Sequence, residues 1–293
     1  MSTKRNLVVV RAGDASLHPR WLLPLAERNW DLVVSYFGDD AQRYREPEVL
    51  RLDAKGPKWP ALHTLLSPGG LDWQRYEHVW LPDDDLDCRG SDINRLFDLS
   101  EALGLQLAQP ALSWQSHISH VITLQQPGFS VRYTSFVEVM APLLSRSFLQ
   151  RVLPTLGANL SGWGLDYLWP RLVDVPGRHS AIIDCVTVTH TRPVGGPNYA
   201  VLAQNGKNAF TEMDELLARF GITDRAQLVY GALDHDGQFS ALPGDGGEAF
   251  VYRLCEGLAA SARVPADALG HFMLEHIQAR RDLASLLQQP RAA

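Results

Sequence analysis

Three consecutive aspartates, Asp83 to Asp85, follow an apolar segment that runs from Tyr76 to Leu81. Such a segment is typical of a strand buried on both faces. Because side chains alternate along a strand, we expect Asp83 and Asp85 to point to one side and Asp84 to the other. Two carboxylates on one side repel each other unless a cation lies between them. Mg²⁺ and Mn²⁺ bind few protein carboxylates and complete their shell with phosphate oxygens, so the pattern predicts a DxD site for a metal and a diphosphate.

The alternative for this stretch is an acidic turn in front of the helix expected to start near Ser91. Other polar residues favour the metal site, because each lies where an apolar segment ends: Arg11, Asp39 and Asp53. In open α/β sheets, ligands collect at the carboxyl ends of the strands. We therefore expect these three residues and Asp83 to lie at one ligand-binding edge.

Three residues further along the chain have the chemistry to complete such a site. Glu138 lies in an alternating segment, 136–142, which predicts a strand with one inward carboxylate. Asp166 follows two glycines that permit a close backbone approach to a ligand, and it would stand in the first turn of a helix. His190 follows a β-branched strand, and imidazole together with carboxylates suits Mn²⁺. The alternatives are a helix-stabilising acid for Asp166 and an ordinary loop residue for His190.

Strands alternate with helices along the first two thirds of the chain. This order predicts an α/β fold with a mostly parallel central sheet that is covered on both faces. After residue 205 the composition changes, and we expect a separate, mainly helical extension at 206–293 that contains a hairpin. The expected strands are 6–11, 30–37, 49–53, 76–81, 106–112, 136–142 and 181–189, and the expected helices are 18–28, 58–66, 91–103, 145–156, 210–220, 248–262 and 265–287.

The composition limits the class of protein. A chain of 293 residues with 45% hydrophobic and 20% charged residues can bury a large core. The net charge of −6 argues against nucleic acid as the main partner. Three distant cysteines, no signal-peptide pattern and no membrane-spanning stretch lead us to expect a cytoplasmic protein. All eight tryptophans lie between Trp21 and Trp169, and aromatic clefts suit the apolar faces of sugars.

Six stretches, in this order, resemble a known family: KGPKWPALHTLL, YEHVWLPDDDLD, GLQLAQPALSW, FVEVMAPLLSR, GWGLDYLWP and IIDCVTVTHTRPV. The family is domain of unknown function 707, which is thought to be related to glycosyltransferases of the GT-A type. The resemblance spans roughly residues 5–200. Asp83 and Asp85 match the two acids of the family, although its middle residue is commonly Glu where this chain has Asp84. Asp166 matches the acid of the W-G-x-D segment, and His190 matches the His after the last strand.

The resemblance implies a GT-A-like, nucleotide-binding α/β/α sandwich in which residues 1–205 form the catalytic domain. It implies transfer of a sugar from a nucleoside diphosphate sugar to a saccharide or other hydroxyl acceptor. The first candidate for the donor is a UDP-sugar. A divalent cation, Mn²⁺ or Mg²⁺, on Asp83, Asp85 and His190 would stabilise the leaving diphosphate. Asp166 would take the acceptor proton, with Glu138 as the next candidate, and the anomeric centre would invert. If Asp166 only holds the acceptor, retention stays open. The nucleotide and donor contacts would come from Arg11, Asp39, Asp53, Lys58 and Asp84.

Two other classes of function stay open. A metal-dependent phosphohydrolase would also need clustered acids, although usually with a fuller set of ligands for two ions. A module that kept the fold and lost turnover would bind the donor without forming product. Self-association of the chain is compatible with either class.

Overall fold

The computed structural model describes residues 4–193, 208–243, 246–261 and 263–288, with side chains up to residue 282. Its strands are β1 (Asn6–Ala12), β2 (Trp30–Tyr36), β3 (Leu50–Asp53), β4 (His78–Trp80), β5 (Leu86–Asp87), β6 (Leu107–Leu112), β7 (Val131–Thr134), β8 (Leu143–Ser145), β9 (Ser180–His190), β10 (Val229–Leu233) and β11 (Phe239–Ala241). Its α-helices are α1 (Lys58–Leu66), α2 (Gly90–Ala102), α3 (Arg146–Val152), α4 (Leu165–Leu168), α6 (Ala209–Arg219), α7 (Gly247–Ala259) and α8 (Ala266–Gln288).

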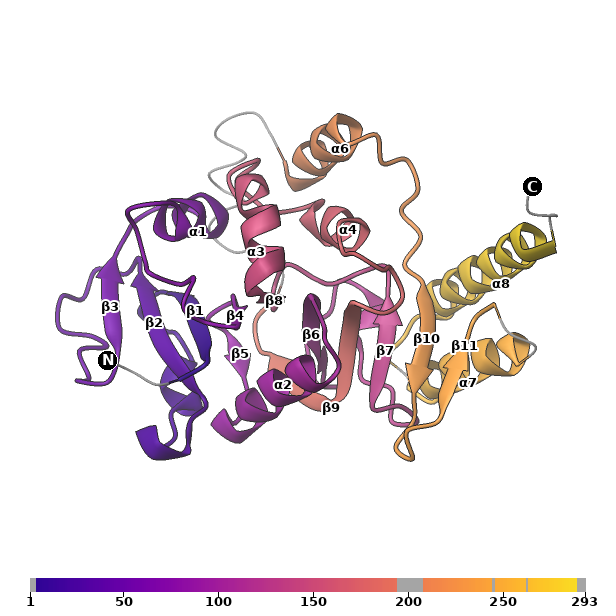
Figure 1. The fold of residues 1–293 in the computed structure, drawn as a ribbon, viewed down its shortest axis with the longest axis horizontal. Coiled ribbons are helices and arrows are strands. Elements are labelled where there is room, and N and C mark those ends of the chain that lie inside the picture. Colours follow the sequence, from indigo (N-terminus) through magenta and orange to yellow (C-terminus); the bar gives the residue numbers. More distant parts are fainter. Residues whose placement is uncertain (1–3, 194–207, 244–245, 262, 289–293) are drawn as a thin grey trace.

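One large mixed sheet organises the molecule. Its order is β11-β10-β7-β9-β6-β8-β4-β1-β2-β3, and β5 pairs with β9 beside it (Figure 1). The two longest ladders, β1–β2 and β6–β9, are parallel, as are β2–β3 and β1–β4. Antiparallel pairs connect β8, β7, β10 and β11 to the rest. The predicted α/β class is therefore confirmed, and the parallel strands β1 to β4 bring their carboxyl ends to one edge.

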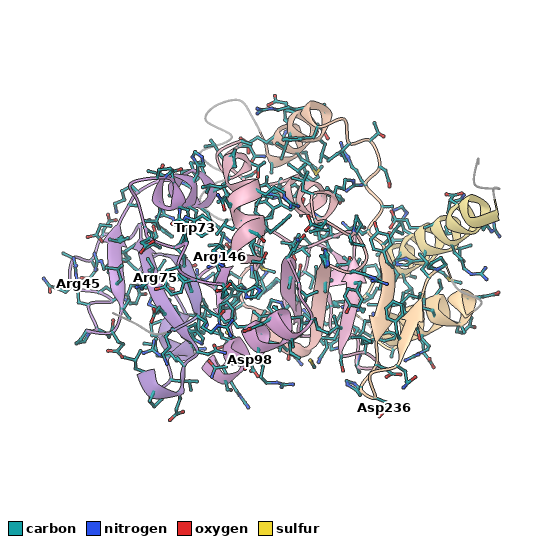
Figure 2. All side chains as sticks on the ribbon, in the orientation of Figure 1. Arg45, Trp73, Arg75, Asp98, Arg146 and Asp236 are labelled. Carbon is teal, nitrogen blue, oxygen red and sulfur yellow. The ribbon has the colours of Figure 1, made fainter. Side chains whose placement is uncertain are left out.

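Both faces of the sheet are buried, which explains the apolar run in β1. Val8 and Val10 lie in one core with residues of α2, whereas Leu7 and Val9 lie in a second core with residues of α1, α3 and α4. Side chains fill the space between the sheet and its helices (Figure 2). This alternation with two apolar faces is what a central strand of an α/β sheet requires.

The part of the chain after residue 207 extends the same sheet. β10 pairs with β7, and β11 pairs with β10 as the predicted hairpin. Helices α6, α7 and α8 share a third core with side chains from the first part of the chain, among them Ile122 and Phe136. The predicted boundary at residue 205 lies outside the described residues. In the described part of the chain, no helix has both the length and the apolar character that a membrane span requires.

The predicted helix at 18–28 is wrong. Two short 3-10 helices, His18–Trp21 and Leu25–Glu27, occupy this segment, and the chain between them is extended at Leu22. Pro24 explains the break, because proline has no backbone N–H and its ring clashes with the preceding turn of an α-helix.

The predicted strand at 136–142 is also wrong. The segment lies between β7 and β8 and turns back, since the Ala141 amide donates to the Glu138 carbonyl. Its carbonyl groups accept hydrogen bonds from the aspartate stretch and the segment before it. The Asp83 amide donates to the Met140 carbonyl, and the Leu81 amide donates to the Pro142 carbonyl. The alternating pattern therefore marks a buried connection that supports the aspartates.

Candidate functional site

The aspartates lie between β4 and β5, and backbone pairing carries them to the end of β9. Leu86 pairs with His190 across β5 and β9. The carbonyl of Asp85 accepts hydrogen bonds from the amide (3.1 Å) and the hydroxyl (2.8 Å) of Thr191. As a result, His190 Nε2 lies 3.3 Å from Asp85 Oδ2, although 105 residues separate the two in the sequence.

The environment of His190 favours a charged imidazole that points at Asp85. Nδ1 lies 2.8 Å from the carbonyl oxygen of His117, to which it donates, so Nε2 faces the carboxylate. Burial lowers the pKa of His190, but the hydrogen bond and charge of Asp85, the His117 carbonyl and the charge of Asp83 outweigh it and raise the pKa to about 9. An orienting carbonyl on one ring nitrogen is the usual support of a histidine that binds metal through the other.

Asp85 has one oxygen that the described residues leave without a partner. Oδ1 is buried and accepts no hydrogen bond from any of them. Asp83 differs, because its Oδ1 lies 2.6 Å from Lys58 Nζ, which also donates to the Val139 carbonyl at 3.0 Å. Within the described ranges, no group of three or more His, Cys, Asp and Glu residues is placed to hold a metal ion. The structure thus presents Asp85 and His190 as a pair, and it engages Asp83 with a lysine.

Asp84 points away from its two neighbours, into contacts within the protein. Its Oδ2 accepts from the Gly13 amide at 2.8 Å, and its Oδ1 lies 3.3 Å from Arg192 Nη1. Arg192 carries no signal in the sequence beyond its place two residues after His190. Asp84 therefore connects the loop after β1 with the segment after β9.

The residues predicted to contact the nucleotide fall into two groups. Arg11 is only 4% exposed, and its guanidinium donates to Ser35 Oγ (2.9 Å) and to the carbonyls of Ala54 (2.9 Å) and Gly56 (2.6 Å). It joins β1, β2 and the segment after β3. Asp39 and Asp53, in contrast, line a pocket of about 330 Å³ at the carboxyl ends of β2 and β3, together with Tyr36, Gly38, Ala41, Arg51, Ala54 and Lys55.

Asp166 and Glu138 form a second pair of acids near the first. Asp166 stands in the first turn of α4, is 6% exposed, and its Oδ1 accepts from the amides of Gly164 (3.1 Å) and Tyr167 (3.0 Å). Burial outweighs these amides and raises the pKa of Asp166 to about 7. Burial and the charge of Asp166 raise the pKa of Glu138 to about 8, against the opposing charges of His190 and Lys58. Glu138 therefore lies within electrostatic reach of Asp166 on one side and of His190, Asp83 and Lys58 on the other.

The two glycines before Asp166 approach protein atoms. A Cβ on Gly162 would lie 2.0 Å from Trp59 Nε1, and one on Gly164 would lie 3.1 Å from a methyl group of Leu216. Both residues have positive φ angles, 81° and 95°, which glycine adopts without strain. The close backbone approach predicted here is therefore made to α1 and α6.

A hydrogen-bonded network that the sequence did not reveal lies behind Asp166. Gln227 Nε2 donates to His120 Nδ1 (2.7 Å) and to the Tyr167 hydroxyl (2.8 Å). The ring of Phe136 packs between His120 (4.5 Å between centroids) and Tyr167 (5.1 Å). Gln227 comes from the part of the chain after residue 207. This part therefore contacts Tyr167, the residue that follows Asp166.

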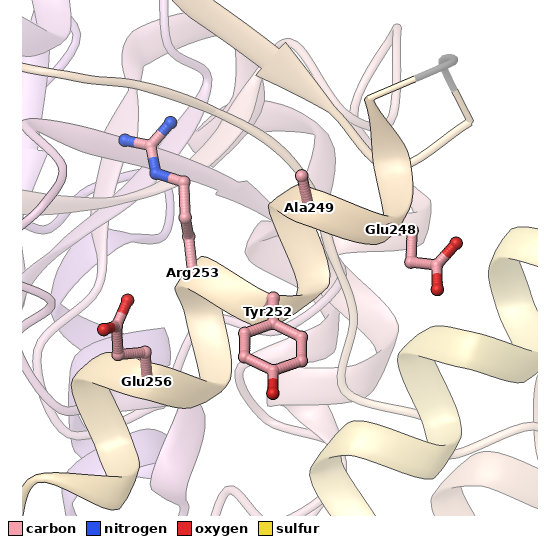
Figure 3. A pocket seen from close by; sticks show the side chains of 5 residues that line it. All are labelled: Glu248, Ala249, Tyr252, Arg253 and Glu256. Atoms are coloured by element: carbon pink, nitrogen blue, oxygen red, sulfur yellow. The ribbon is translucent and has the colours of Figure 1, made fainter.

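A separate surface depression of about 600 Å³ lies on α7 (Figure 3), lined by Glu248, Ala249, Tyr252, Arg253 and Glu256. Helix α7 contacts β11 and α8 at the end of the sheet opposite to β3 (Figure 1). None of the predicted site residues lines this depression.

No protein-family model matches the chain, and no curated protein sequence matches it. Among solved structures, it is similar to glucosyl-3-phosphoglycerate synthase from Mycobacterium tuberculosis in complex with Mn²⁺, UDP-glucose and phosphoglyceric acid, with a TM-score of 0.46 and 17% identity over 82% of this chain and 86% of that chain. It is also similar to S. aureus TarS 1-349 in complex with UDP-GlcNAc, with a TM-score of 0.43 and 12% identity over 97% of this chain and 92% of that one. Likeness at this distance does not bear on what the chain binds or does.

Proposed function

We propose that the chain is a GT-A-like, metal-dependent glycosyltransferase. It moves a sugar from a nucleoside diphosphate sugar to a hydroxyl acceptor and inverts the anomeric centre. A UDP-sugar is the first candidate for the donor. The observation that carries this proposal is the contact of Asp85 with His190 at the carboxyl edge of the parallel strands, where the buried Asp85 Oδ1 has no hydrogen-bond partner among the described residues. A carboxylate and a neutral imidazole fit a divalent cation such as Mn²⁺ that takes its other ligands from phosphate and water. His190 would release the proton that it carries on Nε2 as the ion binds. Asp83 would bind the same ion only if Lys58 released it.

The pocket at β2 and β3 supports a nucleotide donor. Its volume of about 330 Å³ is at the lower end of small-ligand sites, about 300–1,000 Å³. Asp39 and Asp53 offer carboxylate acceptors there for ribose hydroxyl or base N–H groups. The nucleoside would lie in this pocket and the diphosphate would extend along the same edge toward Asp85.

When bound, the cation would act as a Lewis acid that stabilises charge on the leaving diphosphate. The protein contributes orientation and proton transfer. His117 holds the imidazole of His190 with Nε2 toward the site. Two amides hold Oδ1 of Asp166, and Oδ2 would accept the proton of the acceptor hydroxyl. A pKa of about 7 is well matched to a general base at neutral pH.

Titration calorimetry with UDP and GDP, with Mn²⁺ and with a chelator, tests the donor site. We expect Mn²⁺ to strengthen UDP binding at least about tenfold, and Asp85→Asn to abolish that gain. The matched control is Asp87→Asn, two residues further along in β5, because Asp87 is half exposed and forms an ion pair with Arg20 on the surface. Equal UDP affinity with chelator, or an unaltered Mn²⁺ effect in Asp85→Asn, would remove the metal from the function. Binding without turnover on a broad acceptor panel would instead identify an inactive binding module.

A further inference from the structure

The two acid pairs contain more carboxylates than there are described cations beside them. Four carboxylates interact here: Asp83, Asp85, Glu138 and Asp166. In the part of the chain that the structure describes, Lys58 and His190 are the cations that interact with Asp83 and Glu138. Each is already engaged by an acid, Lys58 with Asp83 at 2.6 Å and His190 with Asp85 at 3.3 Å. Among the described residues, neither Glu138 nor Asp166 forms an ion pair. When both acids are ionised, a molecule that approaches them therefore meets negative charge that no ion pair of the described residues compensates.

Glu138 also has an open hydrogen-bonding position. The residue is 8% exposed, and its Oε2 is buried with no hydrogen-bond partner among the described residues. A buried polar oxygen without a partner is destabilising, which is why such atoms are uncommon unless a ligand completes them. A carboxyl oxygen in this position accepts a hydrogen bond from a hydroxyl group of a ligand.

Three N–H donor groups close to Asp166 in the chain are already used within the protein. The amides of Gly164 and Tyr167 donate to the Asp166 carboxylate. The guanidinium of Arg171 donates to the carbonyls of Tyr167 and Asp224, at 2.6 Å each. A phosphate or carboxylate bound beside Asp166 would find these donors, Lys58 and His190 already engaged, and the two acids, when ionised, would repel it.

This inference rests on the proposed function. We propose that the acceptor is an uncharged, hydroxyl-bearing molecule, a sugar or polyol, and that Glu138 binds one of its hydroxyl groups while Asp166 receives the proton of the attacking one. The O–H bond of the attacking hydroxyl breaks as its oxygen bonds to the anomeric carbon, and the nucleoside diphosphate departs with the electrons of the bond that it shared with the sugar. Phosphorylated and carboxylated acceptors are excluded by the same two acids.

The experiment uses the full chain with Mn²⁺ and UDP-glucose or UDP-N-acetylglucosamine at mildly alkaline pH, where Glu138 and Asp166 are ionised. Acceptors are supplied as matched pairs: glucose and glucose 6-phosphate, mannose and mannose 6-phosphate, glycerol and glycerol 3-phosphate. UDP release measures transfer, and thermal shift of the protein with Mn²⁺ and UDP measures acceptor binding without turnover. We expect the neutral member of a pair to be used or bound at least about tenfold better, since one like charge nearby costs that much or more.

Two variants make the test specific to Glu138. Glu138→Gln removes the charge and keeps the shape, so it should reduce the preference for the neutral member severalfold and leave UDP affinity unchanged. The control, Glu77→Gln, changes a surface acid that pairs with Arg146 and should leave the preference as it is. Preference for the phosphorylated member, no neutral member used or bound, or an unchanged preference in Glu138→Gln would overturn the inference while UDP binding is intact. Loss of Mn²⁺-dependent UDP binding would refute the proposed function, and this inference with it.

Discussion

Replacing Asp166 by Asn tests the proposed base. The carbonyl oxygen of the new side chain can keep both hydrogen bonds from the amides of Gly164 and Tyr167, so the start of α4 keeps its geometry. The second carboxylate oxygen becomes an amide nitrogen, which cannot take a proton. Loss of a general base lowers turnover by typically about 10²–10⁴. The affinity for UDP should stay the same, because Asp166 does not line the pocket at β2 and β3.

The same substitution should stabilise the folded protein at neutral pH. Burial raises the pKa of Asp166 from 3.8 to about 7, so the folded state holds the proton more tightly than the unfolded state. An acid shifted in this direction favours the folded state at low pH, and this advantage is lost as the pH rises from about 4 to about 7. The pKa difference corresponds to roughly 4 kcal/mol of stability. Asn also buries a polar group, so we expect Asp166→Asn to gain about 1–3 kcal/mol at neutral pH.

Urea unfolding at about pH 5 and about pH 8, together with UDP release, measures both effects. The control is Asp174→Asn, because the hydrogen bonds of Arg151 and Gln106 lower the pKa of this exposed acid. That variant should gain no stability at the higher pH. Normal turnover in Asp166→Asn would place the base elsewhere, with Glu138 the next residue to test. A loss of stability, or a gain that is equal at both pH values, would refute the account of the buried carboxylate.

Three further predictions concern stability. Arg132 and Asp184 are fully buried and 2.7 Å apart, so Arg132→Met should lower the unfolding free energy by about 3–5 kcal/mol, and adding Asp184→Leu should restore most of it in urea titrations. Burial lowers the pKa of His276 to about 4, so the neutral imidazole stabilises the folded state above about pH 6.5. This contribution is lost as the pH falls from about 6.5 toward 4. The unfolding free energy of His276→Phe should therefore depend less on pH across that range. Gly162→Ala would place a methyl group 2.0 Å from the α1 indole and should cost about 2 kcal/mol or more in thermal unfolding, whereas Gly69→Ala, at a similar φ of 89° with open space around it, should cost less.

Periodicity and chain order predicted α1 and the strands that lead to Asp85 and His190, but not the turn that holds Glu138. Helix α1 occupies 58–66 as expected, because Pro57 and the apolar spacing of Trp59, Leu62 and Leu66 define it. Asp85 and His190 were expected to meet because both follow strands that end at one edge, and they lie 3.3 Å apart. The prediction of their role as metal ligands depends on that contact and on experiment.

Partner choice within the site could not be predicted, because it depends on distances between residues remote in sequence. Lys58 was expected to contact the donor, but its ammonium lies against Asp83 and two carbonyls. Arg11 ends a strand at the expected edge, yet its long side chain turns inward to carbonyls of two other segments. Nothing in composition or spacing identifies Gln227, which reaches Tyr167 from 60 residues away. Side-chain direction and length decide these contacts, and both are set by the packed structure.

The short pairing of β5 with β9 has a consequence for how this site can change by amino-acid substitution. Backbone hydrogen bonds, rather than the side chains themselves, hold positions 85 and 190 next to each other. Substitutions at these two positions can therefore alter the preferred ion without dismantling the scaffold that presents them. A second imidazole at position 85, or a carboxylate at position 190, would offer a softer or a harder ligand pair in the same place. The ladder thus makes the two positions a convenient pair for laboratory evolution of metal preference.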